Sequence, residues 1–203
     1  MPLSDGWGAN KGRKFPVEVL TPEEVASLIG ACSKRGSAGI RDAALIGALY
    51  YGGLRLNEAL QLYPRDVDLE KGTVNVRIGK GSRQRLVALV GDAGGLLIQR
   101  WLDRRAQLGL TGRHRLFCTL KGSEIQQTNV RGTLQRLRDR AGIEKRVHPH
   151  GLRHSHAYNL CMDHGVPVTA ISGQLGHSDV GTTSRYLDHL APEARVSLLR
   201  SLK

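Results

Sequence analysis

Residues 43–58 read AALIGALYYGGLRLNE, and in this stretch a long apolar run passes directly into a charged turn. The apolar run covers 12 residues, whereas a helix that spans a bilayer takes about 20. Its length and composition are typical of a helix buried in a globular core, which we expect over about residues 39–51. Gly52 and Gly53 should end this helix. Arg55 is then expected at the edge of the core, just before a further short helix.

On the N-terminal side of this stretch, a second helix has a clear start signal. Thr21 is a suitable N-cap, Pro22 fits the first turn, and Glu24 completes a capping box. This helix should reach about residue 33. Residues 1–14 are rich in Gly, Lys and Ser and show no periodicity, so we expect a linker or a disordered arm there.

On the C-terminal side, one β-hairpin precedes a series of helices. Val74, Val76 and Ile78 alternate with polar residues, and residues 73–90 are therefore predicted to form an antiparallel hairpin. The predicted helices are a short one from Asn57, three at about 94–109, 128–141 and 150–164, one opened by Pro167, and two short ones at about 179–187 and 192–202. The expected fold is mostly α with a small antiparallel β-sheet, in the α+β class.

The balance of charge favours a polyanionic partner. The chain of 203 residues has 30 Lys and Arg against 18 Asp and Glu, a formal net charge of +12. Nucleic acid is the commonest partner of such a protein. An anionic membrane surface is the alternative, but no basic helix with a strongly apolar opposite face stands out. The three cysteines are far apart with no CxxC, which is typical of a reduced, intracellular protein.

Two clusters could bring cations to an anion. Arg55 and Glu58 share a face if their turn is helical, so Glu58 could orient the guanidinium; the alternative is a surface ion pair that caps a helix. Lys80 lies at the tip of the hairpin and could reach into a groove, or it could be a solvated turn lysine. A basic patch near it, expected to bind DNA, consists of Lys71, Arg83 and Arg85.

A third cluster is the sequence HPHGLRHSH at residues 148–156. His150 and Arg153 are three residues apart at a helix start, where free backbone N–H groups can bind an anion. The histidines also allow a metal site, but His150 and His154 would need two further ligands from elsewhere. The other interpretation of His154 and His156 is packing and hydrogen bonding within the domain.

A fourth cluster combines Leu175-Gly176-His177 with the segment TTSRY, which ends at Tyr186. Tyr50 and Tyr51 lie in the apolar helix and are expected in the core. Tyr186 instead lies in a short polar segment near the C-terminus, which should be exposed.

In their order and chemical types, these clusters resemble the motifs of the tyrosine recombinase or phage integrase family. The motifs are Arg in GLRxxE, Lys on a hairpin, HxLRH, LGH, and Tyr nine residues after the His of LGH. The resemblance runs from about Phe15 to the C-terminus. It implies a catalytic domain over residues 15–190, with Glu58 in a supporting role and catalytic roles for Arg55, Lys80, His150, Arg153, His177 and Tyr186.

The chemistry implied by the resemblance explains these residue types. Two arginines hold the non-bridging oxygens of a phosphodiester and stabilise the extra charge of a five-coordinate state. The phenol of Tyr186 attacks phosphorus, and Lys80 protonates the leaving 5′ oxygen. His150 accepts or relays the tyrosine proton or binds the phosphate, and His177 donates a hydrogen bond to a phosphate oxygen. The product is a 3′-phosphotyrosyl bond, and the reaction needs no metal, ATP or other cofactor.

The resemblance also implies partners and a setting. They are a double-stranded DNA attachment site, assembly as a tetramer on DNA from a monomer without it, an accessory DNA-bending protein, a phage or other mobile-element origin, and the bacterial cytoplasm. No membrane partner is expected. Three alternatives remain: a type IB topoisomerase, a DNA-binding relative without catalysis, and a metal-dependent nuclease.

The N-terminal part of the chain differs from the family pattern, and the C-terminal segment allows two interpretations. Members usually carry a separate helical core-binding domain before the catalytic domain, whereas only a stub precedes it here, so the chain is either truncated or binds DNA with one domain. Residues 191–203 are predicted to be an amphipathic helical segment. This segment either docks on a neighbouring subunit or packs on its own domain.

Overall fold

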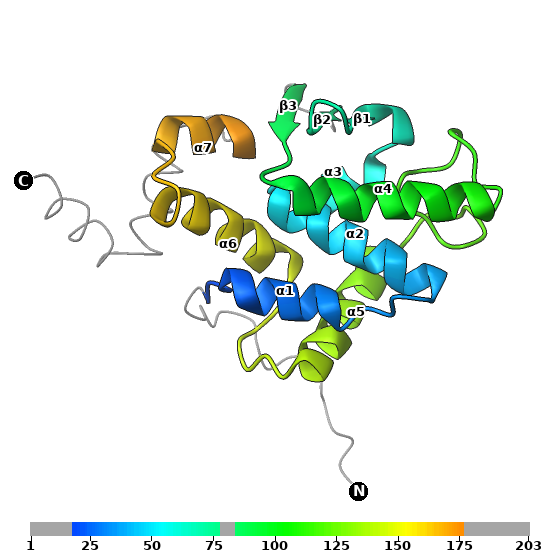
Figure 1. Ribbon diagram of the computed structural model, residues 1–203, viewed down its shortest axis with the longest axis horizontal. Coiled ribbons are helices and arrows are strands. Elements are labelled where there is room, and N and C mark those ends of the chain that lie inside the picture. The colour runs from blue at the N-terminus through cyan, green and yellow to red at the C-terminus, as the bar shows by residue number, and fades with distance from the viewer. Residues whose placement is uncertain (1–17, 78–83, 177–203) are drawn as a thin grey trace, which may run out of the picture.

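The computed structural model describes residues 18–77 and 84–176, and within them helices dominate (Figure 1). The elements, in chain order, are α1 (Pro22–Gly30), α2 (Ser37–Tyr51), α3 (Leu56–Gln61), the 3-10 turn η1 (Pro64–Asp66), β1 (Val67–Asp68), β2 (Thr73–Val76), β3 (Arg85–Ala88), α4 (Asp92–Gln107), α5 (Gln127–Ala141), α6 (Pro149–Met162) and α7 (Val168–Leu175). The mostly α fold with a small antiparallel sheet is confirmed.

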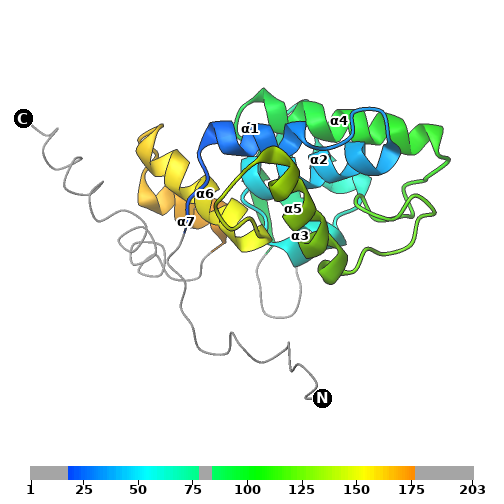
Figure 2. The same cartoon turned by 90° about the horizontal axis from the view of Figure 1, so that it is seen from below.

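Helix α2 lies at the centre and contacts α1, α4 and α6 (Figures 1 and 2). Its residues from Ala43 to Tyr50 are all buried, so it is apolar on every side, as a helix enclosed by others must be. Burying each Leu or Ile stabilises the fold by about 1.5–3 kcal/mol relative to exposure. The apolar run at 43–54 therefore forms the centre of the core, as predicted.

The sheet has three antiparallel strands in the order β1-β2-β3. The predicted hairpin is present, with Val74 opposite Val87 and both side chains buried. Strand β1 was not predicted, because its two residues are too few to show an alternating pattern. Among the described residues β3 pairs with β2 alone, so its other side is an open edge of this part of the sheet.

The helix starts follow the predicted caps. Thr21 and Glu24 form the expected capping box of α1, which ends at Gly30 rather than near residue 33. Helix α5 ends at Gly142 in the left-handed conformation, and Pro167 precedes α7. The predicted arm at 1–14 and the predicted helices at 179–187 and 192–202, with the segment 191–203, lie outside the described residues. In the described part of the chain, the helices are too short or too polar to cross a membrane.

Candidate active site

Arg55 lies directly before α3, where Glu58 holds both its backbone and its side chain. One carboxylate oxygen of Glu58 accepts a hydrogen bond from the Arg55 backbone N–H at 2.9 Å. The other accepts one from Nη1 of the guanidinium at 2.8 Å. Glu58 thus caps the helix and orients Arg55 at once, so the two interpretations of this pair from the sequence are both present. The Arg55 side chain remains 43% exposed.

Glu58 is shared with a second arginine that arrives from strand β3. Nη1 and Nη2 of Arg85 donate to the two Glu58 oxygens at 2.9 and 2.8 Å, a bidentate pair. Burial alone would raise the pKa of Glu58, but the hydrogen bonds and charge of Arg85, with the hydrogen bonds from Arg55, lower it to about 2. The carboxylate is therefore ionised at neutral pH, and both guanidinium groups are held by it.

Arg153 supplies a third guanidinium from α6, and its side chain is only 2% exposed. Nη1 donates to the carbonyl of Gly53 at 2.7 Å and Nη2 to the carbonyl of Leu175 at 2.6 Å. Nη1 also lies 4.0 Å from a Glu58 oxygen. Burial, followed by the charge of Arg55, lowers the pKa of Arg153 to about 9, so the group stays protonated at neutral pH. Three cations are thus gathered around one carboxylate, an arrangement that attracts an anion.

Position 53, two residues before Arg55, requires a glycine for two reasons. Its φ is +59°, and a Cβ there would lie 2.5 Å from the ring of His156. The Gly53 carbonyl accepts the hydrogen bond from Arg153. Burial lowers the pKa of His156 to about 4, so this histidine is neutral and packs in the core. This agrees with the packing interpretation of His156.

His150 is exposed in the first turn of α6, on the helix that carries Arg153. Partial burial of its ring lowers its pKa, and the charge of Arg153 lowers it further. A neutral imidazole can accept a proton, as a general base must. The N-terminal N–H of Gly151, however, is not free for an anion, because it donates to Nδ1 of His148 at 3.0 Å. The ring of His154 is buried against His150, with centroids 4.0 Å apart.

Of the residues expected at the site, the structure brings together Arg55, Glu58, His150 and Arg153, whose charges act on one another. Arg85 joins them: the sequence predicted it in an exposed basic patch, but in the structure its guanidinium faces Glu58. Lys71 lies in the turn between β1 and β2, where it pairs with Asp68 at 2.9 Å. The remaining predicted residues lie outside the described residues: Lys80, Arg83, His177 and Tyr186.

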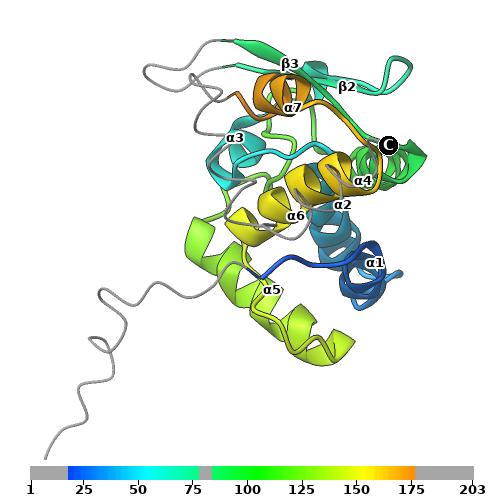
Figure 3. The same cartoon turned by 90° about the vertical axis from the view of Figure 1, so that its left-hand side faces the viewer.

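The end of α7 lies against these arginines. The Leu175 carbonyl accepts a hydrogen bond from Arg153, and the Gln174 carbonyl accepts one from Arg85. Leu175 belongs to a cluster that the sequence already indicated, whereas nothing in the sequence indicated Gln174. Helix α7 lies beside the sheet and next to α6 (Figure 3), which brings its last turn to the arginines. As for a metal, residues 18–77 and 84–176 contain no group of three or more His, Cys, Asp or Glu placed to hold one.

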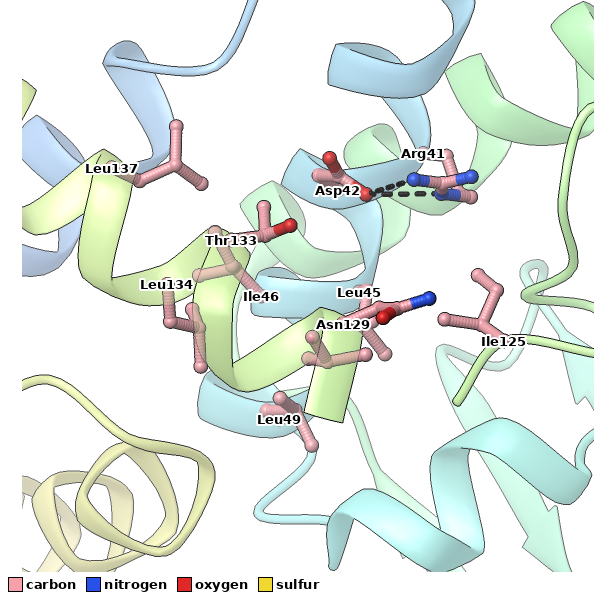
Figure 4. A pocket seen from close by; sticks show the side chains of 11 residues that line it. Arg41, Asp42, Leu45, Ile46, Leu49, Ile125, Asn129, Thr133, Leu134 and Leu137 are labelled. Atoms are coloured by element: carbon pink, nitrogen blue, oxygen red, sulfur yellow. Dashed lines mark hydrogen bonds and ion pairs between the residues drawn. The ribbon is translucent and has the colours of Figure 1, made fainter. Parts of the chain in front are cut away.

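A small cavity of about 40 Å³ lies elsewhere, between α2 and α5 (Figure 4). Its lining is mostly apolar, with the Arg41–Asp42 ion pair at one side. None of the predicted site residues lines it, so it is separate from the arginine cluster.

Comparisons with known proteins agree with this geometry. The Phage integrase family matches residues 18–193. Among curated relatives, the tyrosine recombinase XerD of Bifidobacterium longum is 35% identical over 93% of this chain and 63% of its own length. The tyrosine recombinase XerC of Xanthomonas axonopodis is 38% identical over 88% of this chain and 57% of its own. The chain thus spans about three fifths of the length of these relatives.

Solved structures give the same result. The crystal structure of XerA recombinase has a TM-score of 0.78 and 29% identity, over 93% of this chain and 66% of that one. The XerH site-specific recombinase bound to palindromic difH substrate has a TM-score of 0.74 and 29% identity, over 93% of this chain and 54% of that one. The chain therefore belongs to the phage integrase family, among whose members are the tyrosine recombinases.

Proposed function

We propose that this chain is the catalytic part of a site-specific DNA recombinase that cuts and rejoins strands through a covalent bond to Tyr186. The observation that carries the proposal is the cluster of Arg55, Arg85 and Arg153 around Glu58. A phosphodiester is an anion that gains charge on attack, and fixed guanidinium groups stabilise that charge. The relatives named XerC and XerD support recombination over other reactions of DNA.

The two family arginines would act differently. Arg55 is exposed, and Glu58 leaves part of its guanidinium available, so it can bind a non-bridging oxygen directly. Arg153 is buried and contributes its positive charge to the same site. His150, neutral and exposed beside them, would accept the proton of Tyr186 or bind the phosphate. Which of these it does stays a prediction.

The strand-cleavage step balances without a metal or ATP. The Tyr186 oxygen bonds to phosphorus as its proton leaves, and the bond from phosphorus to the 5′ oxygen breaks. Lys80 supplies the proton to that 5′ oxygen, and His177 donates to the phosphate. A 3′-phosphotyrosyl ester results, and attack by another 5′ hydroxyl reverses the step. The roles of Lys80, His177 and Tyr186 rest on the family resemblance.

The partners follow from the same proposal. The substrate is a double-stranded DNA attachment site, and four copies would assemble on it from monomers, with an accessory DNA-bending protein and in the cytoplasm. Structures of XerH with difH DNA support the DNA partner. Lys71 and Arg83 would contact phosphates, so affinity should fall steeply with salt. Integration or excision of a mobile element remains the expected outcome of the exchange.

The test is covalent trapping in EDTA. The protein is mixed with a nicked duplex that bears a candidate attachment site, and the adduct is counted after denaturation. Tyr186→Phe should abolish the adduct, whereas Tyr158→Phe, on α6, should keep it. An adduct that survives in Tyr186→Phe overturns the assigned nucleophile. Binding without any adduct, also when a core-binding domain is supplied, favours a DNA-binding relative without catalysis.

A second assay separates recombination from topoisomerase activity. A type IB topoisomerase relaxes a supercoiled plasmid that lacks any attachment site, whereas a recombinase joins strands of two different sites. Two labelled duplexes with the site should therefore give recombinant products. Relaxation without strand exchange would move the assignment to the topoisomerase.

A further inference from the structure

The last turn of α7 joins the segments that carry the arginines, and the side chain of Gln174 makes the first connection. Its Oε1 accepts a hydrogen bond from the Ala88 backbone N–H at 3.0 Å. Its Nε2 donates to the Ala88 carbonyl at 2.7 Å. The carboxamide thus pairs with both backbone groups of Ala88, at the open edge of β3, as a neighbouring strand would do. Nε2 also lies 3.3 Å from the carbonyl of Gly52.

The backbone of the same turn makes the second connection. Three consecutive carbonyls each accept a hydrogen bond from a different guanidinium: Gln174 from Arg85 at 3.2 Å, Leu175 from Arg153 at 2.6 Å, and Gly176 from Arg55 at 3.5 Å. Carbonyls at a helix C-terminus have no partner within the helix, and the helix dipole favours cations there. The turn is therefore a fixed acceptor for the whole cluster.

The two connections reinforce each other along the chain. Ala88 lies three residues after Arg85 on β3, and Gly52 lies three residues before Arg55. The Gln174 side chain therefore fixes the backbone of two segments whose guanidinium groups meet the carbonyls of its own turn. An apolar residue of the same size could fill this space. It could not supply the acceptor and the donors that Ala88 and Gly52 use.

We propose that Gln174 is a positioning residue for the strand cleavage proposed above, on which its kinetic effect depends. It holds the end of α7 against β3 and Gly52, and this keeps Arg55, Arg85 and Arg153 in one arrangement. Its side chain touches neither DNA nor the reacting atoms in this role. Small displacements of such groups lower the rate of a chemical step strongly, by as much as about 100-fold for about 1 Å.

The variants are Gln174→Leu, which keeps the volume but removes every hydrogen bond of the side chain, and Gln174→Glu. The carboxylate of Gln174→Glu still accepts from the Ala88 N–H but cannot donate to the two carbonyls. Gln107→Leu changes an exposed glutamine at the end of α4 and is the matched control. Each full chain is tested for DNA affinity and for the rate constant of adduct formation at saturating DNA.

We expect Gln174→Leu to lower the rate constant about tenfold or more, with the dissociation constant for DNA changed less than about twofold, because phosphate contacts dominate affinity. A loss of folded protein alone would lower the amount of adduct but not its rate constant. A rate constant equal to that of Gln107→Leu overturns the positioning role, whatever the stability of the variant.

A second measurement does not depend on cleavage. Hydrogen exchange of the Ala88 amide should be faster in Gln174→Leu, while Gln174→Glu should retain the protection of that amide. Unchanged exchange in Gln174→Leu overturns the pairing itself. If the unaltered chain forms no adduct, the proposed function fails with the kinetic role, and exchange alone decides the pairing. If Gln174→Leu does not fold, a rate constant in Gln174→Glu equal to that of the unaltered chain overturns the proposal.

Discussion

Replacing Glu58 by glutamine would remove the carboxylate that pairs with Arg55 and Arg85. The pKa of Glu58 is lowered from 4.5 to about 2 in the folded protein, and one pKa unit is equivalent to about 1.36 kcal/mol. The ionised carboxylate therefore stabilises the folded state at neutral pH by about 3 kcal/mol. A glutamine side chain is nearly the same size as that of Glu58, so Glu58→Gln should cost about that much without leaving a cavity.

The sign of the pH dependence follows from the direction of this shift. A carboxyl group whose pKa is lowered on folding stabilises the folded state fully at pH values above its ordinary pKa. This stabilisation is lost as pH falls toward the pKa in the folded state. The difference between the original chain and Glu58→Gln should therefore shrink from about 3 kcal/mol at pH 7 to about 1 kcal/mol at pH 3.

Urea unfolding of both chains, followed by circular dichroism at several pH values, measures this difference. Glu24→Gln is the matched control, because Glu24 also caps a helix but pairs with a single cation, Lys145. We expect a loss of about 1 kcal/mol or less for that variant. A loss below about 1 kcal/mol for Glu58→Gln, or one that does not depend on pH, would refute the reasoning about the shared carboxylate.

Three further predictions concern single groups of the site. Gly53→Ala should destabilise the fold by about 3 kcal/mol or more, because it combines a positive φ with a Cβ 2.5 Å from His156. Thermal unfolding measures this loss, and a double variant with His156→Ala should recover part of it. The pKa of His156 is lowered on folding from 6.5 to about 4, so the free energy of unfolding should fall as pH drops from 6.5 to 4. In His156→Phe this fall should be smaller by about 3 kcal/mol. An equal fall in the two chains would contradict the prediction. Arg55→Lys keeps the charge but loses the planar guanidinium group. The rate constant of adduct formation should therefore fall about 100-fold or more, while DNA affinity changes little. A fall below about threefold would contradict a role for Arg55 in stabilising the reacting phosphate.

Much of the fold could be predicted because its signals are local. The capping box of Thr21 and Glu24, the apolar run of α2, and the alternation of Val74 and Val76 each act within a few residues. The pairing of Arg55 with Glu58 is also local, since three residues separate them on one helical turn. Strand β1 and the end of α1 were missed or misplaced because short elements carry too little pattern.

The sequence by itself determined which chemical groups this protein has: two family arginines, their acid, the histidines and the tyrosine, in an order that marks the family. Only the tertiary structure decided which groups meet. Arg85 reaches Glu58 across 27 residues, Arg153 reaches Gly53 across 100, and Gln174 reaches Ala88 across 86. These partners come from different elements, and the packing of α6, α7 and β3 around α2 and α3 brings them together. No local pattern can specify such a contact, because its energy depends on where the whole core places the backbone.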